Sequence, residues 1–372
     1  EEGRKKKKKK KKDNKRDNDS MTTQAPVSAG IVCTLRMPPP PSRENDGDGQ
    51  LGDPSREIVD SFIRYHLSKG FQHIWLFFDD PNDHTFDQAR SFPLCNVSAI
   101  RRKTTEEQEA AWKSSTLLSR LGGLETARRE VTARQMLNAE LAMKEAVDSK
   151  STPEKQVEYL VHIDIDELFY TGENSVIPHF TWLRDQGIDH MTYANHEGVP
   201  EAESIRNYFT EVSLFRKNHL TLGIHPRTRE AMSFWTKRTR HHQYLLFYDN
   251  GKSSVRVSAN ATPASVHGWF ISPPRQTSSS SSSSLGATTT TTTTKPSPPP
   301  PPPRMATALA DIRNLDMSRV VSLSEPCILH FPVCGWFWFK SKYHILGDFA
   351  SEWTNPSSGG GGGGGVHAGA AS

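Results

Sequence analysis

The stretch from Val157 to Phe169 constrains the fold more than any other part of the chain. It begins as a short apolar run with β-branched and aromatic residues, the pattern of a buried strand. It ends in three acids, Asp164, Asp166 and Glu167, and unpaired carboxylates are costly to bury. We therefore expect the acids where the strand leaves a sheet, which is where open α/β sheets bind ligands.

Alternation along a strand points Asp164 and Asp166 in the same direction. Two converging carboxylates supply the hard oxygen ligands that Mg²⁺ and Mn²⁺ prefer, and such ions are often shared with substrate phosphates. The pattern thus predicts a metal site at the end of this strand. A simpler alternative, a solvated acidic turn after a core strand, stays open on the sequence alone.

Segments typical of strands and helices alternate along the chain. Strands are predicted at Ala29–Leu35, Gln72–Phe78, Val97–Arg101, His190–Tyr193, Val212–Phe215, Tyr244–Tyr248 and Cys327–Phe331, and a turn followed by a strand at Gly251–Val257. Helices are predicted at Ser55–Lys69, Leu124–Val147 and Ile177–Gln186. This alternation predicts an α/β fold in which a mainly parallel sheet carries helices on both faces.

Low-complexity segments flank and interrupt the foldable part. We expect a disordered basic tail at residues 1–27, disordered insertions at about 37–54 and 273–305, and a flexible glycine-rich tail at 351–372. One domain then spans residues 28–350. The formal net charge is +4, and the run of eight lysines from Lys5 to Lys12 outweighs it. Basicity therefore belongs to the tail, and no nucleic-acid partner is expected.

Neither the cysteines nor the apolar segments add a further constraint. The four cysteines show no spacing typical of a zinc site or a disulfide framework. No run of about twenty apolar residues predicts a membrane-spanning helix. The chain begins with Glu and not Met, so we treat it as a potential fragment whose upstream signal or anchor would be missing here.

Several motifs, taken in order, resemble glycosyltransferase family 92 and related family-2-like proteins over about residues 29–345. The closest is the segment from His162 to Phe169 with its Asp-x-Asp-Glu core. Phe62 and Ile63 stand where Trp is common in the family, a mild departure. The other matching motifs are Tyr65-His66, Asp79-Asp80-Pro81, Arg134-Gln135-x-x-Asn138, Gly251-Lys252-Ser253, Val266-His267-Gly268 and Leu329-His330-Phe331.

This resemblance implies a GT-A fold, which is Rossmann-like, and a nucleotide-sugar donor, with a UDP-sugar expected. It also implies Mn²⁺ or Mg²⁺ as cofactor and transfer to an acceptor hydroxyl of a glycan, lipid or protein with inversion at the anomeric carbon. Members of such families point to the Golgi or secretory membranes, with any anchor absent from this chain.

Candidate metal ligands follow from the chemistry of sugar transfer, in which a metal neutralises the departing diphosphate. Asp166 is the expected direct ligand, and Asp164 is expected to bind the metal or the donor ribose. Glu167 is expected to support them as a hydrogen-bond acceptor or ion-pair partner. His267 is the preferred third ligand, and His330 is the alternative.

Other residues are candidates for binding the donor or activating the acceptor. Asp79 and Asp80 are expected to accept hydrogen bonds from the nucleoside, as the resembling turn does. Lys252 and Arg256 are expected to contact the diphosphate. Inversion needs a general base, and Glu197, in a predicted loop after the strand His190–Tyr193, is the first choice. Its competitors are Glu201, Glu203 and Asp189.

Two alternatives to a glycosyltransferase stay open. Haloacid-dehalogenase-type phosphatases also carry Asp-x-Asp after a strand, but Thr or Val normally follows where Leu168 stands here. A non-catalytic binding protein built on a degenerate transferase domain is the second.

The aromatic group Trp336–Phe339 is expected to belong to the core and not to form a sugar-binding platform.

Overall fold

The computed structural model describes residues 25–40, 52–148, 150–218, 250–271, 320–322 and 325–346, with a few isolated positions between 227 and 238. Several predictions fall outside these described residues. They concern the tails at residues 1–24 and 351–372, most of the first insertion, the insertion at 273–305, and the strand Tyr244–Tyr248.

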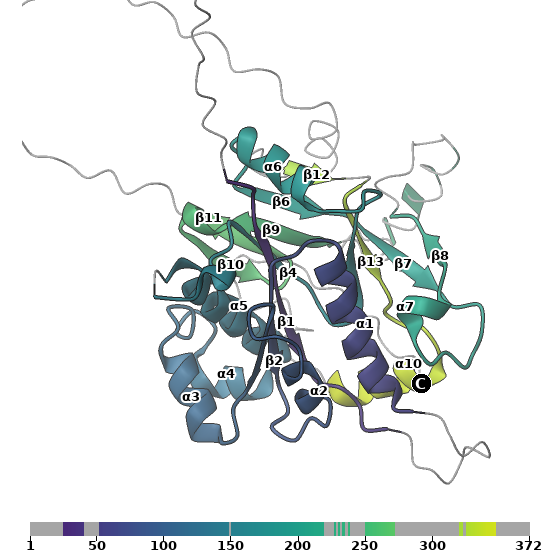
Figure 1. Ribbon diagram of the computed structural model, residues 1–372. Helices are drawn as coiled ribbons and strands as arrows, with labels where there is room; N and C mark the ends of the chain where they lie inside the picture. Colours follow the sequence, from purple (N-terminus) through teal and green to yellow (C-terminus); the bar gives the residue numbers. More distant parts are fainter. Residues whose placement is uncertain are drawn as a thin grey trace, which may run out of the picture.

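A seven-stranded sheet forms the centre of the molecule (Figure 1), in the order β12-β6-β9-β4-β1-β2-β3. Only β9 runs antiparallel to its neighbours within this sheet. The mainly parallel α/β fold is therefore as predicted. The strands are β1 (Ala29–Leu35), β2 (His73–Phe78), β3 (Val97–Arg101), β4 (Tyr159–His162), β6 (His190–Tyr193), β9 (Lys252–Arg256) and β12 (Val320–Ser322).

The strand order reverses at β1. From β1 the chain passes to β2 and β3 on one side, whereas β4 pairs with β1 on the other side. Such a switch point leaves a crevice outside the carboxyl ends of the two strands, where open α/β sheets bind ligands. The acidic segment after β4 ends in this crevice.

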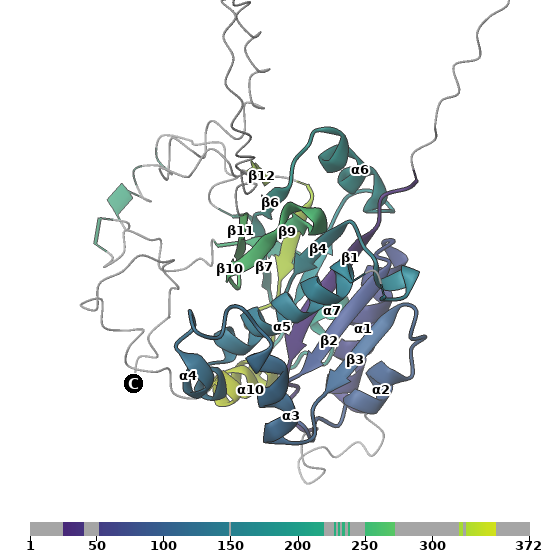
Figure 2. The same ribbon diagram turned by 90° about the vertical axis from the view of Figure 1, so that its left-hand side faces the viewer.

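Alternate residues of each central strand enter two different cores. Ile31 and Cys33 belong to the core on one face, and Val32 belongs to the core on the other. Helices α1 (Pro54–Ser68) and α6 (Ile177–Asp185) pack on the first face, and α5 (Val131–Val147) packs on the second. Figures 1 and 2 show α1 and α5 on opposite sides of the sheet. Helices on both faces are therefore confirmed.

Local signals define α1 at both ends. Asp53, and not Ser55, is the N-cap, and its carboxylate accepts a hydrogen bond from the Ser55 backbone N–H at 3.0 Å. At the other end Gly70 has a φ of 91°, which a glycine tolerates at the position that terminates a helix. The predicted helix is thus correct within one residue at each end.

A second sheet has the order β5-β13-β7-β8 and lies beside the first. Its strands are β5 (Glu167–Tyr170), β7 (Asn195–Val199), β8 (Leu214–Arg216) and β13 (Cys327–His330), and a separate hairpin pairs β10 (Ala261–Ser265) with β11 (Gly268–Ile271). The loop predicted at Asn195–Gly198 is wrong, because these residues form strand β7. Glu197 pairs with Arg216 of β8, and Asn195 and His196 bond with Asn218 just after β8, contacts that the alternation of apolar residues does not reveal.

The remaining helices differ from the sequence prediction in two places. The helix predicted at Leu124–Val147 is broken at Glu130 (φ −101°, ψ 115°), which separates α4 (Gly123–Arg129) from α5. The aromatic segment near the end forms helix α10 (Trp336–Leu346). The other helices are α2 (Phe86–Arg90), α3 (Thr105–Lys113) and α7 (Tyr208–Glu211), with short 3-10 turns at Pro153–Lys155 and Val257–Ala259.

Helix α10 divides its aromatic residues between core and surface. Trp338 is buried, with 7% of its surface exposed, whereas Trp336 is 59% exposed and stacks on Phe339. The expected core role therefore holds for Trp338 and is wrong for Trp336. No helix in the described part of the chain is both long and apolar enough to span a membrane.

Candidate active site

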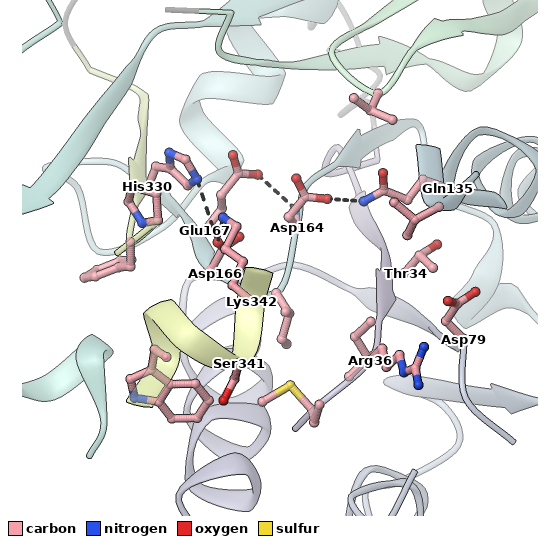
Figure 3. A pocket seen from close by; sticks show the side chains of 18 of the residues that line it. Thr34, Arg36, Asp79, Gln135, Asp164, Asp166, Glu167, His330, Ser341 and Lys342 are labelled. Carbon is pink, nitrogen blue, oxygen red and sulfur yellow. Dashed lines mark hydrogen bonds and ion pairs between the residues drawn. The ribbon is translucent and has the colours of Figure 1, made fainter. Parts of the chain in front are cut away.

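A pocket of about 260 Å³ opens at the carboxyl edge of the central sheet, at the switch point between β1 and β4. Residues 34–38 at the end of β1 and residues 164–167 after β4 line one part of it, and His330 of β13 and the next residue, Phe331, line another. Helix α10 covers the pocket with Trp338, Ser341 and Lys342 (Figure 3). The acidic segment joins β4 of the first sheet to β5 of the second, so it lies where the two sheets meet.

Asp164 is held through both of its carboxylate oxygens. Gln135 donates a hydrogen bond to Oδ1 at 2.6 Å, and the Lys252 ammonium lies 2.6 Å from Oδ2. The Lys252 side chain is only 1% exposed and also lies 3.5 Å from Glu167 Oε2. Burial alone would raise the pKa of Asp164, but Lys252 holds this pKa below its usual range.

Asp166 contacts other pocket residues than Asp164 does. Strand β4 ends at His162 and residues 165–166 form a turn, so the strand alternation that predicted a common direction for the two aspartates does not extend to them. Its Oδ2 lies 2.6 Å from the Lys342 ammonium and 3.8 Å from His330 Nε2. The Phe331 N–H donates to the Asp166 carbonyl oxygen at 2.9 Å, which ties the acidic segment to the strand that carries His330. Burial opposes ionisation, but Lys342 and His330 lower the pKa of Asp166.

Glu167 supports the acidic segment from inside. Its Oε2 accepts a hydrogen bond from the Asp164 backbone N–H at 2.8 Å. Burial, reinforced by Asp164 and Asp166, raises the pKa of Glu167 to about 8 despite the nearby Lys252. The supporting role expected for Glu167 is consistent with this contact.

Both candidate histidines line the pocket as neutral imidazoles. Burial lowers the pKa of His330 to about 3 and that of His267 to about 4. His267 donates from Nδ1 to the Gly251 carbonyl oxygen at 2.8 Å, which places the lone pair on Nε2. Gly251 is required there, because its φ is 62° and an added Cβ would lie 2.1 Å from the Tyr193 carbonyl oxygen.

Helix α5 holds three different parts of the pocket wall. Arg134 pairs with both oxygens of Asp79 at 2.5 and 2.8 Å, and Gln135 holds Asp164. Asn138, one turn further on, donates to Thr34 Oγ1 at 3.0 Å. These three side chains share one face of the helix because they are spaced one and then three residues apart. The motif Arg134-Gln135-x-x-Asn138 therefore has a structural explanation.

Not every predicted site residue reaches the pocket. Asp79 lines it, but Asp80 pairs instead with Arg36 at 3.6 Å. Arg256 lies at the far end of β9, where it pairs with Glu158 at 2.8 Å. Four residues of strand separate it from Lys252, about 13 Å. The predicted contact between Arg256 and a diphosphate at this pocket is therefore not supported by its position.

The candidates for the base are also placed apart from the pocket lining. Glu197 lies in β7, directly across from His330 of β13, and is paired with Arg216 of β8. Glu201 and Glu203 are exposed in the segment after β7. Asp189 precedes β6 and lies 3.8 Å from Arg256, which places it at the opposite edge of the sheet.

The residues present fit a divalent cation as a site of few protein ligands. Within the described residues no group of three or more His, Cys, Asp or Glu side chains is arranged to hold a metal ion. Two ligands bound at about 2.1 Å each lie at most about 4.2 Å apart, and the 3.8 Å between Asp166 Oδ2 and His330 Nε2 meets that condition. Mg²⁺ typically takes one or two carboxylates and completes its shell with water and phosphate oxygens.

Gln135 and Lys342, which contact the two aspartates of the pocket, were not among the candidates predicted from sequence. Gln135 belongs to the motif Arg134-Gln135-x-x-Asn138, which marks this part of the helix but does not predict that Gln135 contacts Asp164. Lys342 carried no signal, because its contact with Asp166 joins residues 176 positions apart. Pairs of this separation depend on the complete fold.

Comparison with known proteins gives partial matches. No family model matches the chain. A protein of Arabidopsis thaliana described as glycosyltransferase-like is 27% identical over 214 residues, which cover 56% of this chain and 45% of the relative. A second one is 30% identical over 178 residues, which cover 45% of this chain and 32% of the relative. The chain thus spans less than half the length of these relatives.

One solved structure is also similar over part of its length. It is the mannosyltransferase Ktr4p from S. cerevisiae in complex with GDP, matched over 48% of this chain and 42% of its own at 9% identity. The TM-score is 0.20, too low to establish a shared fold.

Proposed function

We propose that this chain is a metal-dependent glycosyltransferase that moves a sugar from a nucleotide-sugar donor to an acceptor hydroxyl with inversion. Two relatives described as glycosyltransferase-like support glycosyl transfer in general. The α/β fold with its mainly parallel sheet is consistent with a GT-A-like enzyme. Membership in family 92, the metal and the stereochemistry are parts of the proposal.

One observation carries the proposal. Asp164 and Asp166 face a pocket at the switch point of the sheet, with a neutral histidine 3.8 Å from Asp166. Carboxylates in such a crevice suit a hydrated divalent cation and the phosphates that it would share. A sugar nucleotide offers both a diphosphate for the cation and a ribose for the neighbouring carboxylate.

The residues around the acidic segment then have separate roles in this proposal. Asp166 and His330, the alternative to the preferred His267, would hold the ion, because His330 is the histidine 3.8 Å from Asp166. A bound Mn²⁺ or Mg²⁺ would stabilise the charge on the leaving diphosphate as a Lewis acid. Gln135 and Lys252 orient Asp164, so that its carboxylate accepts hydrogen bonds in one fixed direction. Glu167 braces the backbone of Asp164. His267 is the candidate for a contact with the donor on the side of Asp164.

An inverting transfer also needs a base on the side of the sugar opposite the diphosphate. We keep Glu197 as the candidate, because it lies beside His330 in the second sheet. The pair with Arg216 must open before Glu197 accepts a proton.

We expect Glu197→Gln to lower turnover by about two decades or more while donor binding stays nearly unchanged. Steady-state rates and donor affinity measured together check this, and wild-type turnover would move the role of base to Glu201 or Glu203.

The test of the proposed function is a thermal-shift screen of nucleoside diphosphates with and without Mn²⁺. Selective binding raises the unfolding temperature, so we expect one diphosphate to stabilise the protein only when Mn²⁺ is present. The matching nucleoside monophosphate serves as the control, because it lacks the second phosphate. Hydrolysis of the corresponding sugar nucleotide then distinguishes an enzyme from a binding protein. The absence of any Mn²⁺-dependent stabilisation would contradict the proposal.

A second candidate is a binding protein on a transferase-like domain. The observation in its favour is that each carboxylate is already paired with a lysine, Asp164 with Lys252 and Asp166 with Lys342. Such a protein would bind the sugar nucleotide and leave it intact. Binding in the thermal-shift screen without turnover of donor would select this candidate.

A further inference from the structure

Lys342 occupies the position at Asp166 that a divalent cation would need. Its ammonium lies 2.6 Å from Asp166 Oδ2, the same oxygen that lies 3.8 Å from His330 Nε2. An ion about 2.1 Å from that oxygen would share its space and its charge with the ammonium. The two cations therefore compete for one carboxylate oxygen.

The two lysines of the pocket differ in their freedom to move. Lys252 is 1% exposed and is shared between Asp164 and Glu167, so its displacement would leave the Asp164 carboxylate without its counter-charge. The Lys342 side chain is 34% exposed. Its long aliphatic stem and strongly hydrated head allow it to change partners at little cost.

Helix α10 is fixed at its start, so a side chain can move without the helix. The buried Trp338 donates from Nε1 to the Ile205 carbonyl oxygen at 3.0 Å, and the Trp336 N–H donates to the Glu203 carbonyl oxygen at 2.8 Å. Lys342 lies one turn beyond Trp338 on the side that lines the pocket. The anchored turn thus sets how far the ammonium reaches.

We propose that Lys342 is an exchangeable cation that holds Asp166 until the divalent ion arrives, and that it then pairs with the donor diphosphate. The proposal rests on the function proposed above. Lys342 gives up Asp166 Oδ2 and its ammonium then donates to a phosphate oxygen, so one positive charge stays at the pocket throughout. Asp166 is never left buried without a partner. The ordered exchange favours binding of the ion and the diphosphate together over binding of the ion alone.

The test uses Lys342→Met, which keeps the length of the side chain and removes its charge. Binding of Mn²⁺ alone, followed by the electron paramagnetic resonance signal of the free ion, should become tighter by about tenfold or more because a competing charge is gone. Binding of UDP at saturating Mn²⁺, followed by calorimetry, should become weaker by about tenfold or more because a charge-assisted hydrogen bond is lost. GDP replaces UDP if the wild type selects it. The two affinities therefore move in opposite directions.

Lys340→Met is the matched control, because Lys340 lies over the exposed Trp336 ring on the same helix and outside the pocket lining. It should leave both affinities unchanged. Lys342→Gln repeats the test if Lys342→Met does not unfold cooperatively. Mn²⁺ binding that is unchanged or weaker in the Lys342 variants, or UDP binding that is unchanged, overturns the exchange. A wild type that binds neither Mn²⁺ nor a nucleoside diphosphate overturns the proposed function and the exchange with it.

Discussion

Asp166 is the residue at which contacts from the end of strand β13 and from α10 converge. We expect Asp166→Asn to weaken Mn²⁺-dependent nucleotide binding by more than about 100-fold, since loss of even an outer partner of a metal ligand commonly costs 10- to 100-fold. The shape of the side chain is kept, so folding should survive. Calorimetry with Mn²⁺ and nucleotide checks the affinity, and circular dichroism checks the fold. Asp185→Asn, an exposed acid on α6, is the control. Retained metal-dependent binding would remove Asp166 from the site.

Gly251 allows a test of close packing at the strand that carries Lys252. Gly251 and Gly187 have nearly the same positive φ, 62° and 65°, but an added Cβ clashes with the Tyr193 carbonyl oxygen only at Gly251. Gly187→Ala should cost about 1–2 kcal/mol in free energy of unfolding, the usual penalty of a left-handed residue. Gly251→Ala should cost more and should also weaken nucleotide binding, because His267 is held by the Gly251 carbonyl. Denaturant unfolding of both variants measures the difference, and equal costs would exclude the clash.

At the scale of elements, His66 joins helix α1 to strand β5. It donates from Nδ1 to the Phe62 carbonyl oxygen at 2.8 Å and accepts from the Phe169 N–H on Nε2 at 3.1 Å. The bond from the Phe169 N–H requires the neutral ring, because a protonated Nε2 cannot accept a hydrogen bond, and burial lowers the pKa of His66 to about 3. The unfolded chain, with a pKa near 6.5, binds the proton first. The stability that His66 contributes is therefore complete above about pH 6.5 and is lost as the pH falls toward 3.

We expect His66→Gln to cost about 1–3 kcal/mol at pH 7, because one hydrogen bond is lost inside the core. Between about pH 4 and 6 the variant should lose stability less steeply than the wild type, by about 1.4 kcal/mol per pH unit for the one proton removed. Urea unfolding at several pH values measures both effects. His344→Gln on the exposed side of α10 should keep the wild-type slope. A slope unchanged in His66→Gln would show that another group dominates the acid response.

Elements with a strong local signal are the part of the fold that sequence patterns predict well. Strands β1, β3 and β6 have the predicted bounds, and α1 and α6 agree within one residue at each end. Apolar alternation and helical spacing carry that information without any tertiary contact. Strand β7 does not match the predicted loop, because its polar side chains bond with residues distant in the sequence, Arg216 of β8 and Asn218 just after it.

Some residues of the candidate site could likewise be predicted from the sequence, and others could not. Asp164 and Asp166 follow a recognisable strand, so their place in the pocket could be inferred from position alone. Lys342 could not, because nothing near it in the chain distinguishes it from other surface lysines. Arg256 was wrongly predicted to lie at the pocket because it is close in sequence to a residue of the site. Lys252, four residues away, contacts Asp164 of the pocket, but Arg256 lies at the other end of the same strand.

At the scale of the whole molecule, the pocket is assembled from segments that span residues 34 to 342. We therefore expect Mn²⁺ and nucleotide to slow backbone hydrogen exchange at residues 163–170 and in α10 together, because ligands lower the population of open states wherever they bind. Exchange measured by mass spectrometry with and without both ligands checks this. Strand β3 does not line the pocket and serves as the internal control. Protection confined to one of the two segments would show that α10 does not take part in binding.

The break at Glu130 has a consequence for how this chain tolerates length changes. An α-helix turns about 100° per residue, so a single insertion directly after Asn138 would rotate Arg134, Gln135 and Asn138 relative to the rest of the helix. Such a change would disturb the supports of Asp79, Asp164 and Thr34 together. The extended backbone at Glu130 interrupts that rotation. Residues can therefore be inserted or deleted before Glu130 without changing which face of α5 points toward the pocket.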